Sequence, residues 1–375
     1  MDYKSEPAGY CSVERRYRSP TGATPEGKLG GEGTQMTKRF PKIRDVAEAA
    51  GVSTATVSRA LSAPEMVSED TRAIVLKAVE ATGYRMNHAA RNLRRRQAGG
   101  IVVLVPNLAN PFFAQILSGI AAAMAPSGYN VLIADTRQAD AGSSILDYLH
   151  NNRADGLIVL DAGLPEEMLS AGQTRAFQPP IVFACEWLDN DDRASVTIDN
   201  AYGARLAVDH LVALGHRRIG HVMGPPDNIL TVTRAQGTRA ALAAHDLAPR
   251  GDWFFEGDFS LASGAAAAQR WLALDDRPTA VFCASDAMAG GFIGALHRAG
   301  VRVPEDVSVV GFDDIEIAAH LVPALTTIAQ PRRQIGETAA QKLLDLIRKT
   351  GQPGRAKDVL PVELVVRDST AVPAS

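Results

Sequence analysis

Residues 43–61 read IRDVAEAAGVSTATVSRAL, and this stretch decides the fold of the first part of the chain. Apolar residues recur at helical spacing from Ile43 to Ala50, which predicts a short helix with one narrow apolar face. Gly51 can end that helix in a left-handed conformation at little steric cost, and Ser53 stands where a second short helix needs its N-cap. Two short helices joined by a glycine-containing turn predict a helix-turn-helix, whose second helix enters a DNA major groove. The alternative is an ordinary helical hairpin in a larger bundle.

Five short motifs follow one another between residues 43 and 94: IRDVAEAAGVS, TVSRAL, VSEDTR, GYRMN and ARNLR. In order and spacing they closely resemble the DNA-binding headpiece of the lactose/galactose repressor family of bacterial transcription regulators. The resemblance continues downstream and covers nearly the whole chain after Thr37. It implies a ligand-responsive, sequence-specific DNA-binding regulator that acts as a repressor and needs no cofactor.

Composition sets the class of the protein. At 375 residues the chain exceeds one typical core and should form two or three domains. Its 46% hydrophobic and 22% charged residues are ordinary for a soluble globular protein, and no apolar run approaches the roughly 20 residues that span a bilayer. Three widely spaced cysteines, Cys11, Cys185 and Cys283, form neither a disulfide framework nor a metal pair. We therefore expect a cytoplasmic protein without a bound metal.

The net charge of −3 hides an asymmetry along the chain. Residues 37–97 hold 12 Lys and Arg against 6 Asp and Glu, whereas residues 98–375 hold 22 against 31. A small basic module joined to a large acidic body is typical of a polyanion-binding head with a separate sensing or assembly body.

Residues 1–36 are predicted to be a disordered N-terminal extension. They are rich in Gly, Pro, Ser and Thr, and they lack the apolar surface that would offset ordering entropy. Met36 stands just before the family-like start, so translation can begin there. The alternative is a DNA-contacting arm that uses Arg15, Arg16 and Arg18, which the equal number of acidic residues in this stretch disfavours.

The helix-turn-helix domain is predicted over residues 37–84, with a third helix capped by Ser68. Residues 85–97, RMNHAARNLRRRQ, then connect it to the rest of the chain. A helix of about two turns starting at Asn87 is marginal alone in water, so a basic flexible linker is the alternative. The resemblance implies a hinge helix that pairs with its dimer mate and folds on the DNA minor groove, with Leu93 as the wedge between base pairs.

From Gly100 onward, buried apolar runs alternate with amphipathic stretches of helical length. The runs are IVVLV (101–105), VLIAD (131–135), GLIVL (156–160), IVFAC (181–185), IGHVM (219–223), AVFCA (280–284) and VSVVGF (307–312). The amphipathic stretches are residues 112–127, 201–214, 234–245 and 288–299. Repeated β-α units predict an α/β fold of doubly wound parallel sheets with right-handed crossovers.

The resemblance implies a two-lobed body, like periplasmic sugar-binding proteins, over residues 98–368. Its chain is expected to cross three times between the lobes. The expected boundaries are about 99–197 and 329–355 for lobe 1, about 198–328 and 356–368 for lobe 2, and a tail at residues 369–375.

Sequence-specific recognition needs exposed side chains at the start of the second helix. By resemblance, Thr54 and Ala55 occupy positions that vary with operator sequence, and Arg59 a third position that often reads guanine. The fork of Arg59 suits guanine O6 and N7, and a phosphate contact or a salt bridge is the alternative. The other expected DNA-binding residues are Ser53, Thr56 and Ser58, which suit phosphates, and Asn87, Leu93 and Arg94 of the hinge.

A ligand cleft is expected at the carboxyl ends of the strands, between the lobes. The expected effector-binding residues are Asn110, Phe112, Phe113, Cys185, Arg234, Ser285, Asp286, Asp313 and Gln330. By resemblance, Arg234 clamps polar groups of the ligand, while Asp313 and Gln330 line the cleft. Aromatic faces, an arginine fork and paired acceptors suit a sugar, a sugar phosphate or a nucleoside.

Several alternatives for these residues stay open. Phe112 and Phe113 can instead be core residues of the helix that they open, and Asp286 or Asp314 can cap a following helix. Cys185 stands where several sugar-responsive members of the family have a carboxylate, so no one member's ligand can be carried over directly.

An enzyme is not expected, because no G-x-S-x-G, GxxxxGK[ST] or HExxH motif occurs. His210 and His216 are six apart on one predicted helix and face different ways, which makes a poor metal pair. An enzyme that uses the same head, or an architectural DNA-binding protein, is the alternative, although the second leaves the large body unexplained.

The mechanism that the resemblance implies is a dimer whose two heads read a near-palindromic operator. A ligand in the cleft changes the angle between the lobes and moves the hinges. This requires that the ligand bind the two arrangements of the lobes with different affinities. Whether the ligand releases DNA as an inducer or strengthens DNA binding as a corepressor stays open. A tetramer is not expected, because the chain ends at RDSTAVPAS, where the family's tetramerising helix would follow.

Overall fold

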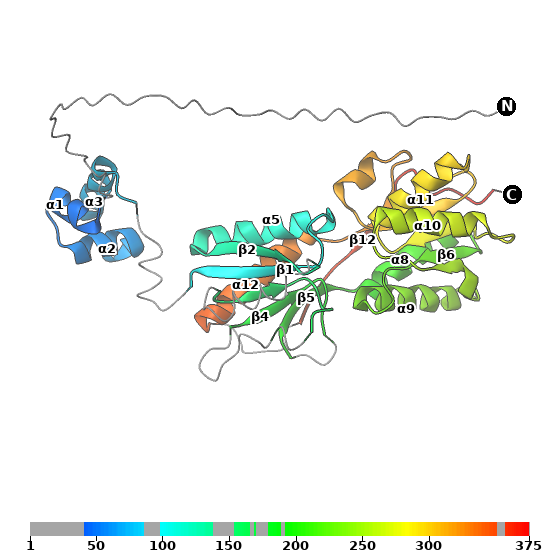
Figure 1. The fold of residues 1–375 in the computed structure, drawn as a ribbon, viewed down its shortest axis with the longest axis horizontal. Coiled ribbons are helices and arrows are strands. Elements are labelled where there is room, and N and C mark those ends of the chain that lie inside the picture. The colour runs from blue at the N-terminus through cyan, green and yellow to red at the C-terminus, as the bar shows by residue number, and fades with distance from the viewer. Residues whose placement is uncertain are drawn as a thin grey trace, which may run out of the picture. The chain divides into compact units, whose positions relative to one another are not determined.

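The computed structural model describes residues 41–85, 98–137, 154–165, 169, 179–188, 192–350 and 357–374. The chain divides into two compact units, residues 1–86 and 87–375, which we call the head and the body (Figure 1). The expected N-terminal extension and all of the expected hinge except Arg85 lie outside the described residues.

The head is built from three helices, α1 (Ile43–Ala50), α2 (Thr54–Ser62) and α3 (Glu69–Thr82), with a short 3-10 turn, η1 (Pro64–Met66). Gly51 ends α1 with a φ of 65°, and the Ser53 hydroxyl accepts a hydrogen bond from the Thr56 amide at 3.1 Å, so the predicted turn and cap are confirmed. Ser68 precedes α3 as predicted, but its hydroxyl lies 2.9 Å from the Thr71 hydroxyl and is not bonded to a helix amide.

The core of the head is small. Within residues 41–85 its buried apolar side chains are Val46, Ala47, Val57, Ala60, Val75 and Ala78. Each helix contributes two of them, so the three helices depend on one another for burial.

The body contains two sheets whose strands are almost all parallel. The first has the order β11-β5-β4-β3-β1-β2 and consists of β1 (Gly100–Val105), β2 (Asn130–Asp135), β3 (Leu157–Val159), β4 (Ile181–Ala184), β5 (Ala194–Ile198) and β11 (Lys357–Leu360). The second has the order β12-β10-β9-β8-β6-β7 and consists of β6 (Ile219–Val222), β7 (Phe254–Phe255), β8 (Ala280–Cys283), β9 (Ser308–Asp313), β10 (Thr326–Ala329) and β12 (Glu363–Val365). The seven predicted strands are confirmed, and β12 alone among the described strands runs antiparallel, to β10.

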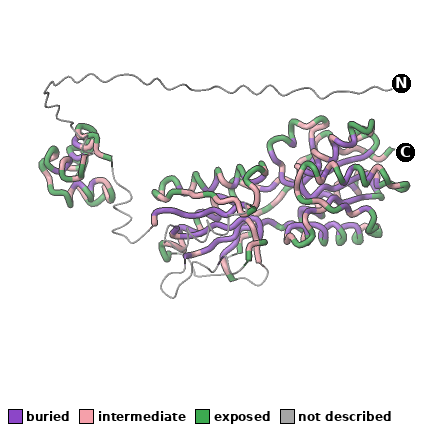
Figure 2. The backbone as a smooth tube through the Cα atoms, viewed as in Figure 1, coloured by how far each residue is buried: buried purple, intermediate pink, exposed green. Residues whose placement is uncertain are grey.

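Helices cover these sheets. They are α5 (Phe112–Met124), α8 (Asn200–Ala213), α9 (Ile229–Ala244), α10 (Leu261–Leu272), α11 (Asp286–Arg298) and α12 (Arg332–Arg348), with 3-10 turns η2 (Ala125–Ser127), η3 (Gly251–Trp253) and η4 (Glu316–His320). In the second lobe, alternate residues of β8 face opposite sides: Phe282 packs in the cluster with α8 and α9, and Val281 in the cluster with α10 and α11. The central strands are buried (Figure 2), as doubly wound parallel sheets require. The expected burial of residues 131–135 is wrong, because β2 lies at an edge of the first sheet and is partly exposed.

In the first lobe, α5 packs closely against α12. A Cβ atom on Gly119 would collide with the backbone carbonyl of Arg333, and one on Gly336 would collide with that of Ile116. The two helix backbones can therefore approach only because both positions lack a side chain.

The chain passes between the sheets from β5 into α8, from β10 into α12 and from β11 into β12. The expected lobe boundary at residue 356 needs correction, because β11 pairs with β5 at the edge of the first sheet, with Lys357 opposite Ser195. This third crossing therefore falls at residues 361–362. The physical reason is that β5 offers an open edge, which the returning segment fills.

The residues expected to form a tail are bound to the second lobe. The Ser369 hydroxyl is fully buried; it donates to the Val309 carbonyl at 2.6 Å and accepts from the Thr326 amide at 2.9 Å. The amide of Ala371 donates to the Ser308 hydroxyl at 3.0 Å. Residues 369–371 thus belong to the folded body.

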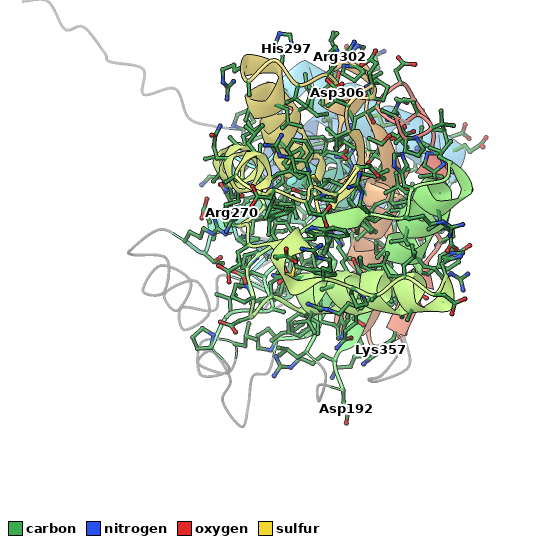
Figure 3. The ribbon with its side chains drawn as sticks, turned by 90° about the vertical axis from the view of Figure 1, so that its right-hand side faces the viewer. Asp192, Arg270, His297, Arg302, Asp306 and Lys357 are labelled. Carbon is green, nitrogen blue, oxygen red and sulfur yellow. The ribbon has the colours of Figure 1, made fainter. Side chains whose placement is uncertain are left out.

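Charged side chains such as Arg302 and Asp306 project from the surface of the second lobe (Figure 3), where they form an ion pair of 2.9 Å. None of the helices in the described ranges combines the length and apolar character that a membrane crossing requires.

Candidate functional site

The first candidate surface is the exposed face of α2. Thr54, Ala55, Ser58 and Arg59 are exposed, while Val57 turns inward and is fully buried. This division follows from the helical period, which places buried and exposed positions on opposite faces. The helix therefore presents a hydroxyl, a methyl group and a guanidinium on one accessible side.

The start of α2 is held in place by its own side chains. The Ser53 hydroxyl bonds both the amide and the hydroxyl of Thr56, at 3.1 and 2.9 Å. Within residues 41–85, no carboxylate pairs with Arg59, so its guanidinium is available to a partner. The expected hinge contacts Asn87, Leu93 and Arg94 lie outside the described residues.

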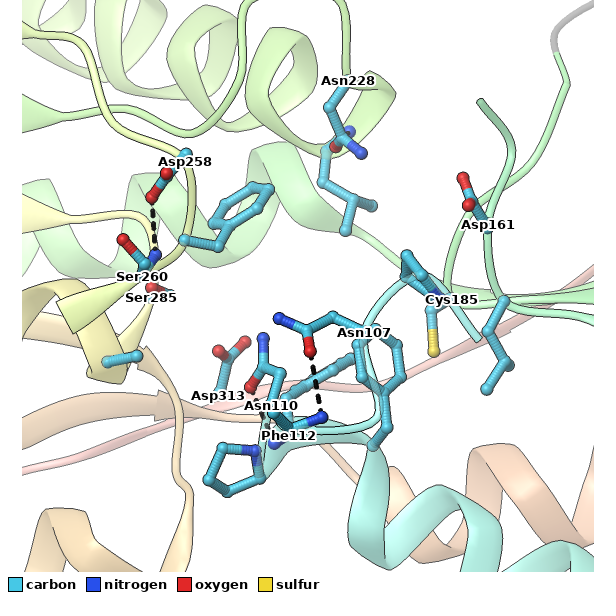
Figure 4. Close-up of a pocket in the computed structure, with 18 of the residues that line it drawn as sticks. Asn107, Asn110, Phe112, Asp161, Cys185, Asn228, Asp258, Ser260, Ser285 and Asp313 are labelled. Carbon is cyan, nitrogen blue, oxygen red and sulfur yellow. Dashed lines mark hydrogen bonds between the residues drawn. The ribbon is translucent and has the colours of Figure 1, made fainter. Parts of the chain in front are cut away.

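The second candidate site is a cavity of about 310 Å³ between the two lobes of the body (Figure 4). It lies at the carboxyl ends of β1, β3, β4, β8 and β9, where open α/β sheets bind ligands. Seven of the nine expected effector-binding residues line it: Asn110, Phe112, Phe113, Cys185, Arg234, Ser285 and Asp313. Its size is at the small end of the range for ligand pockets.

Arg234 is the most constrained side chain of this cavity. Its guanidinium is buried, donates to the Asn200 side chain at 2.9 Å and to the Ala284 carbonyl at 2.5 Å, and lies 3.8 Å from the ring centroid of Phe312. It also lies 3.9 Å from a carboxylate oxygen of Asp313. These four contacts, two of them hydrogen bonds, fix one orientation of the guanidinium before any ligand arrives.

Asp313 ends β9 with a φ of 119°, a conformation that is strained for a residue with a side chain. Burial raises its pKa to about 6, although Arg234, Arg332 and a hydrogen bond from Gln330 favour the charged form. The Gln330 amide donates to Asp313 at 2.7 Å. This carboxyl can therefore accept from a ligand hydroxyl above its pKa and donate below it.

Two expected residues do not line the cavity. Gln330 lies behind Asp313 and holds it in place. Asp286 is buried; it accepts from the Ile315 amide at 2.8 Å and from the Thr327 hydroxyl at 2.5 Å, which ties α11 to the segments around β9 and β10. Their role in the expected cleft is corrected to support of its wall, because each carries its polar atoms toward the protein.

The alternative roles can now be compared with the structure. Ser285 caps α11 by accepting from the Met288 amide at 3.2 Å, so Asp286 is not the cap of that helix. Asp314 does not cap η4 either, because Ile315 is the N-cap residue there and no side chain bonds the first turn. Phe112 and Phe113 pack edge to face with ring centroids 5.0 Å apart. Both rings belong to a buried core cluster that extends into both lobes, and both also line the cavity, so each ring is at once a core residue and a cavity residue.

Glu186 is not among the expected effector-binding residues, but it lines the cavity. One of its carboxylate oxygens accepts from the Asn228 side chain and the other from the Ala162 amide, both at 2.7 Å. Because Asn228 caps α9 in the second lobe, this carboxylate joins the lobes across the cavity. Burial raises the pKa of Glu186 and of the Cys185 thiol. The Cys185 thiol therefore stays protonated and is a poor nucleophile.

Other lining residues were not predicted. They include Asn107, Arg137, Asp161, Asn228, Asp258 and Phe259. Asn107 and Asp161 follow β1 and β3 directly, so the strand-end rule could have found them. Asp258 and Phe259 follow β7, a strand of two residues that is too short to be recognised from its apolar residues.

Comparison with known proteins places both regions. Residues 42–87 match the family model described as bacterial regulatory proteins, lacI family, and residues 208–370 match that of a periplasmic binding protein-like domain. The HTH-type transcriptional repressor CytR of Escherichia coli (strain K12) is 40% identical over 330 residues, which cover 88% of this chain and 96% of that protein.

Solved structures agree with this placement. The lac repressor dimer bound to operator and the anti-inducer ONPF is 32% identical, with a TM-score of 0.75 over 89% of this chain and 100% of that one. A complex of the transcriptional regulator CelR with cellobiose is also 32% identical, with a TM-score of 0.68 over 88% and 99%. The chain belongs to the lacI family of bacterial regulatory proteins and is a ligand-responsive, DNA-binding transcriptional regulator.

Proposed function

We propose that this regulator binds a near-palindromic operator as a dimer and represses transcription from it. The observation that carries the proposal is the joining, in one chain, of an exposed polar helix face on α2 and a built cavity between two lobes. A two-fold dimer presents two such helices to two half-sites, and this symmetry is mirrored in the operator. The lac repressor dimer, which is bound to its operator, supports the same arrangement here.

On α2, Arg59 reads a guanine while Thr54 and Ala55 contact neighbouring base edges. Ser53, Thr56 and Ser58 contact phosphates and position the helix. The exposure of Thr54, Ala55 and Arg59 on α2 supports these roles. The expected hinge contacts Asn87, Leu93 and Arg94 lie outside the described residues and stay predictions, with Leu93 expected by resemblance to enter the minor groove.

The effector is a sugar, sugar phosphate or nucleoside that binds in the cavity. The edges and faces of Phe112 and Phe113 supply apolar contact, and Arg234 with Asp313 supplies a donor and an acceptor side by side. The cellobiose bound by the related CelR supports a carbohydrate-like ligand. Binding without turnover is the expected outcome, and a regulator of chromosomal DNA is expected in the cytoplasm.

Ligand binding changes the angle between the lobes and thereby the hinge segments of the dimer. The Glu186–Asn228 hydrogen bond supports this, because it joins the lobes at the cavity and any ligand that alters it alters their arrangement. Only a ligand with different affinities for the two arrangements can shift DNA binding.

The test uses the full-length chain in two steps. A selection from random duplexes should yield a near-palindromic site, and a thermal-shift screen of sugars, sugar phosphates and nucleosides should yield a ligand that stabilises by about 2.7 kcal/mol at 100 times its dissociation constant. Fluorescence anisotropy on the selected duplex should then change when this ligand is added. A chain that shows no sequence preference for any duplex contradicts the proposal.

A further inference from the structure

The charges that line the cavity are predominantly negative. Its carboxylates are Asp161, Glu186, Asp258 and Asp313, and its guanidinium groups are Arg137 and Arg234. Arg234 is already engaged by Asn200, the Ala284 carbonyl and Asp313, and Arg137 is exposed at the rim. An incoming anion therefore meets more repulsion than attraction.

The strongest anion-binding device of α/β proteins is the N-terminus of a helix, where free amides and the helix dipole attract phosphate. At α5, these amides are already used. The amide of Phe112 donates to the Asn110 side chain at 3.0 Å, that of Phe113 to the Asn110 carbonyl at 3.2 Å, and that of Ala114 to the Pro111 carbonyl at 3.2 Å. The first turn of α5 thus offers no free amide to a phosphate.

The other three helices that begin at the cavity carry their own side-chain caps. Asn228 accepts from Leu230 in α9 at 2.9 Å, Ser260 from Ser263 in α10 at 3.1 Å, and Ser285 from Met288 in α11 at 3.2 Å. Two of these ends also carry a carboxylate. Glu186 bonds the cap of α9, and Asp286 lies in the first turn of α11, so the chain itself offsets the positive ends of those dipoles.

The cavity carboxylates remain acceptors toward a ligand. Asp161 accepts from the Thr136 hydroxyl at 2.5 Å and from the Gly163 amide at 3.0 Å, and Asp258 accepts from the Ser260 amide at 2.9 Å. A carboxylate has about four acceptor sites, so each keeps some for a ligand. Hydroxyl and amino groups can donate to them, whereas a phosphate dianion presents only acceptors.

We infer that the cleft selects an unphosphorylated, polyhydroxylated ring, a free sugar or nucleoside, and rejects the phosphate ester of the same compound. The inference rests on the proposed effector class and narrows it by excluding sugar phosphates. The acceptor-rich lining, the used amides of α5, and the side-chain cap that holds one amide in each of α9, α10 and α11 point to this ligand chemistry.

The test is a set of matched pairs on the full-length protein. Ribose is compared with ribose 5-phosphate, glucose with glucose 6-phosphate, and the common ribonucleosides with their 5′-monophosphates, by thermal shift and then by isothermal titration calorimetry. The unphosphorylated partner of at least one pair should bind, with its ester at least about tenfold weaker. An ester that binds as tightly as its parent, or more tightly, overturns the inference and leaves the proposed function standing. If no member of any pair binds, the proposed effector class fails and the inference fails with it.

A charge-removing variant makes the test specific to the cavity. Asp258→Asn keeps an oxygen for the Ser260 amide while it removes one negative charge, so the preference for the unphosphorylated partner should fall by about three- to tenfold. Asp306→Asn removes the same charge at the surface of the same lobe, next to Arg302, and should leave the preference unchanged (Figure 3). Equal preference ratios in the two variants would contradict the electrostatic origin of the selection.

Discussion

Helix α2 of the head and the cleft of the body are both candidate binding surfaces, but they are built differently. The candidate residues of the head, apart from the hinge, lie in one run from Ser53 to Arg59 on α2. The cleft gathers side chains from the ends of strands in two sheets and from the starts of four helices. Within residues 41–85, the side chains of Thr54, Ala55 and Arg59 share no hydrogen bond or ion pair, whereas in the cleft Arg234, Asp313 and Gln330 share contacts. We therefore expect nearly additive substitutions on α2 and coupled ones in the cleft.

The largest effect is expected from Arg234→Ala. It removes a buried guanidinium and leaves Asp313 buried without its charged neighbour, which should lower the free energy of unfolding of the body by about 3–5 kcal/mol. Urea denaturation measures the change. The matched control is Arg205→Ala on α8, whose exposed guanidinium lies 3.8 Å from Asp209 and should contribute less than about 1 kcal/mol.

The same pair tests the coupling directly. Replacing both partners, in Arg234→Met with Asp313→Leu, should cost less than Arg234→Ala alone, because no charge is then left unpaired. If the losses of unfolding free energy in the Arg234→Met and Asp313→Leu single variants simply add in the double variant, the cleft is no more coupled than α2.

The next effect concerns the head. Arg59→Ala should relax the preference at one operator base pair by about 1–3 kcal/mol while other positions keep theirs, because a bidentate guanine contact is lost. Ser58→Ala serves as the comparison and should weaken binding to all duplexes alike. Anisotropy titrations on single-substituted operators measure both. Uniform weakening by Arg59→Ala would make this residue a phosphate contact.

A pH effect is expected in the body and not in α2. The pKa of Asp313 is raised to about 6 in the folded protein, so the folded state binds the proton more tightly than the unfolded state. The stability contributed by this group is therefore fully present below pH of about 4 and is lost as the pH rises through 6, with a slope of at most about 1.4 kcal/mol per pH unit. Denaturation of the parent protein and of Asp313→Asn at a series of pH values measures this. The free energy of unfolding of the variant should lack the part of the slope that Asp313 contributes. An unchanged slope would assign the effect to other buried carboxyls, such as Glu186.

The smallest effect is expected from Ser53→Ala, which removes the hydroxyl that accepts from the Thr56 amide. The head should lose about 1 kcal/mol, seen as faster hydrogen exchange of the amides in α2. Ser62→Ala is the control on the same helix, because its hydroxyl donates to the Ser58 carbonyl within the helix and caps no amide. Equal acceleration by both would show that the cap is not what holds the start of α2.

Much of the fold was readable because its signals are local. The turn at Gly51, the cap at Ser53 and the apolar runs of the strands depend on neighbouring residues only, and the structure confirms them. The strands β7 and β11 were missed, because β7 is only two residues long and β11 is partly exposed. Val359 of β11 is more than half exposed, so burial left no pattern there to detect.

The cleft shows the same limit. The strand-end rule placed Asn110, Cys185 and Asp313 correctly at the cavity, because each follows a strand in sequence. It could not tell Ser285, which lines the cavity, from Asp286, which turns to Thr327 from another strand. Nor could it pair Glu186 with Asn228, 42 residues away in the other lobe.

The sequence by itself determined that a helix-turn-helix precedes an alternating α/β body, because helical period, capping and strand burial are properties of short segments. Only the tertiary structure decided which polar side chains face the cavity and which support its wall. It also decided that β11 returns to the first sheet and that residues 369–371 close the second lobe. Those choices depend on an open strand edge or on a hydrogen-bonding partner far away in the chain, and neither leaves a trace in the local pattern.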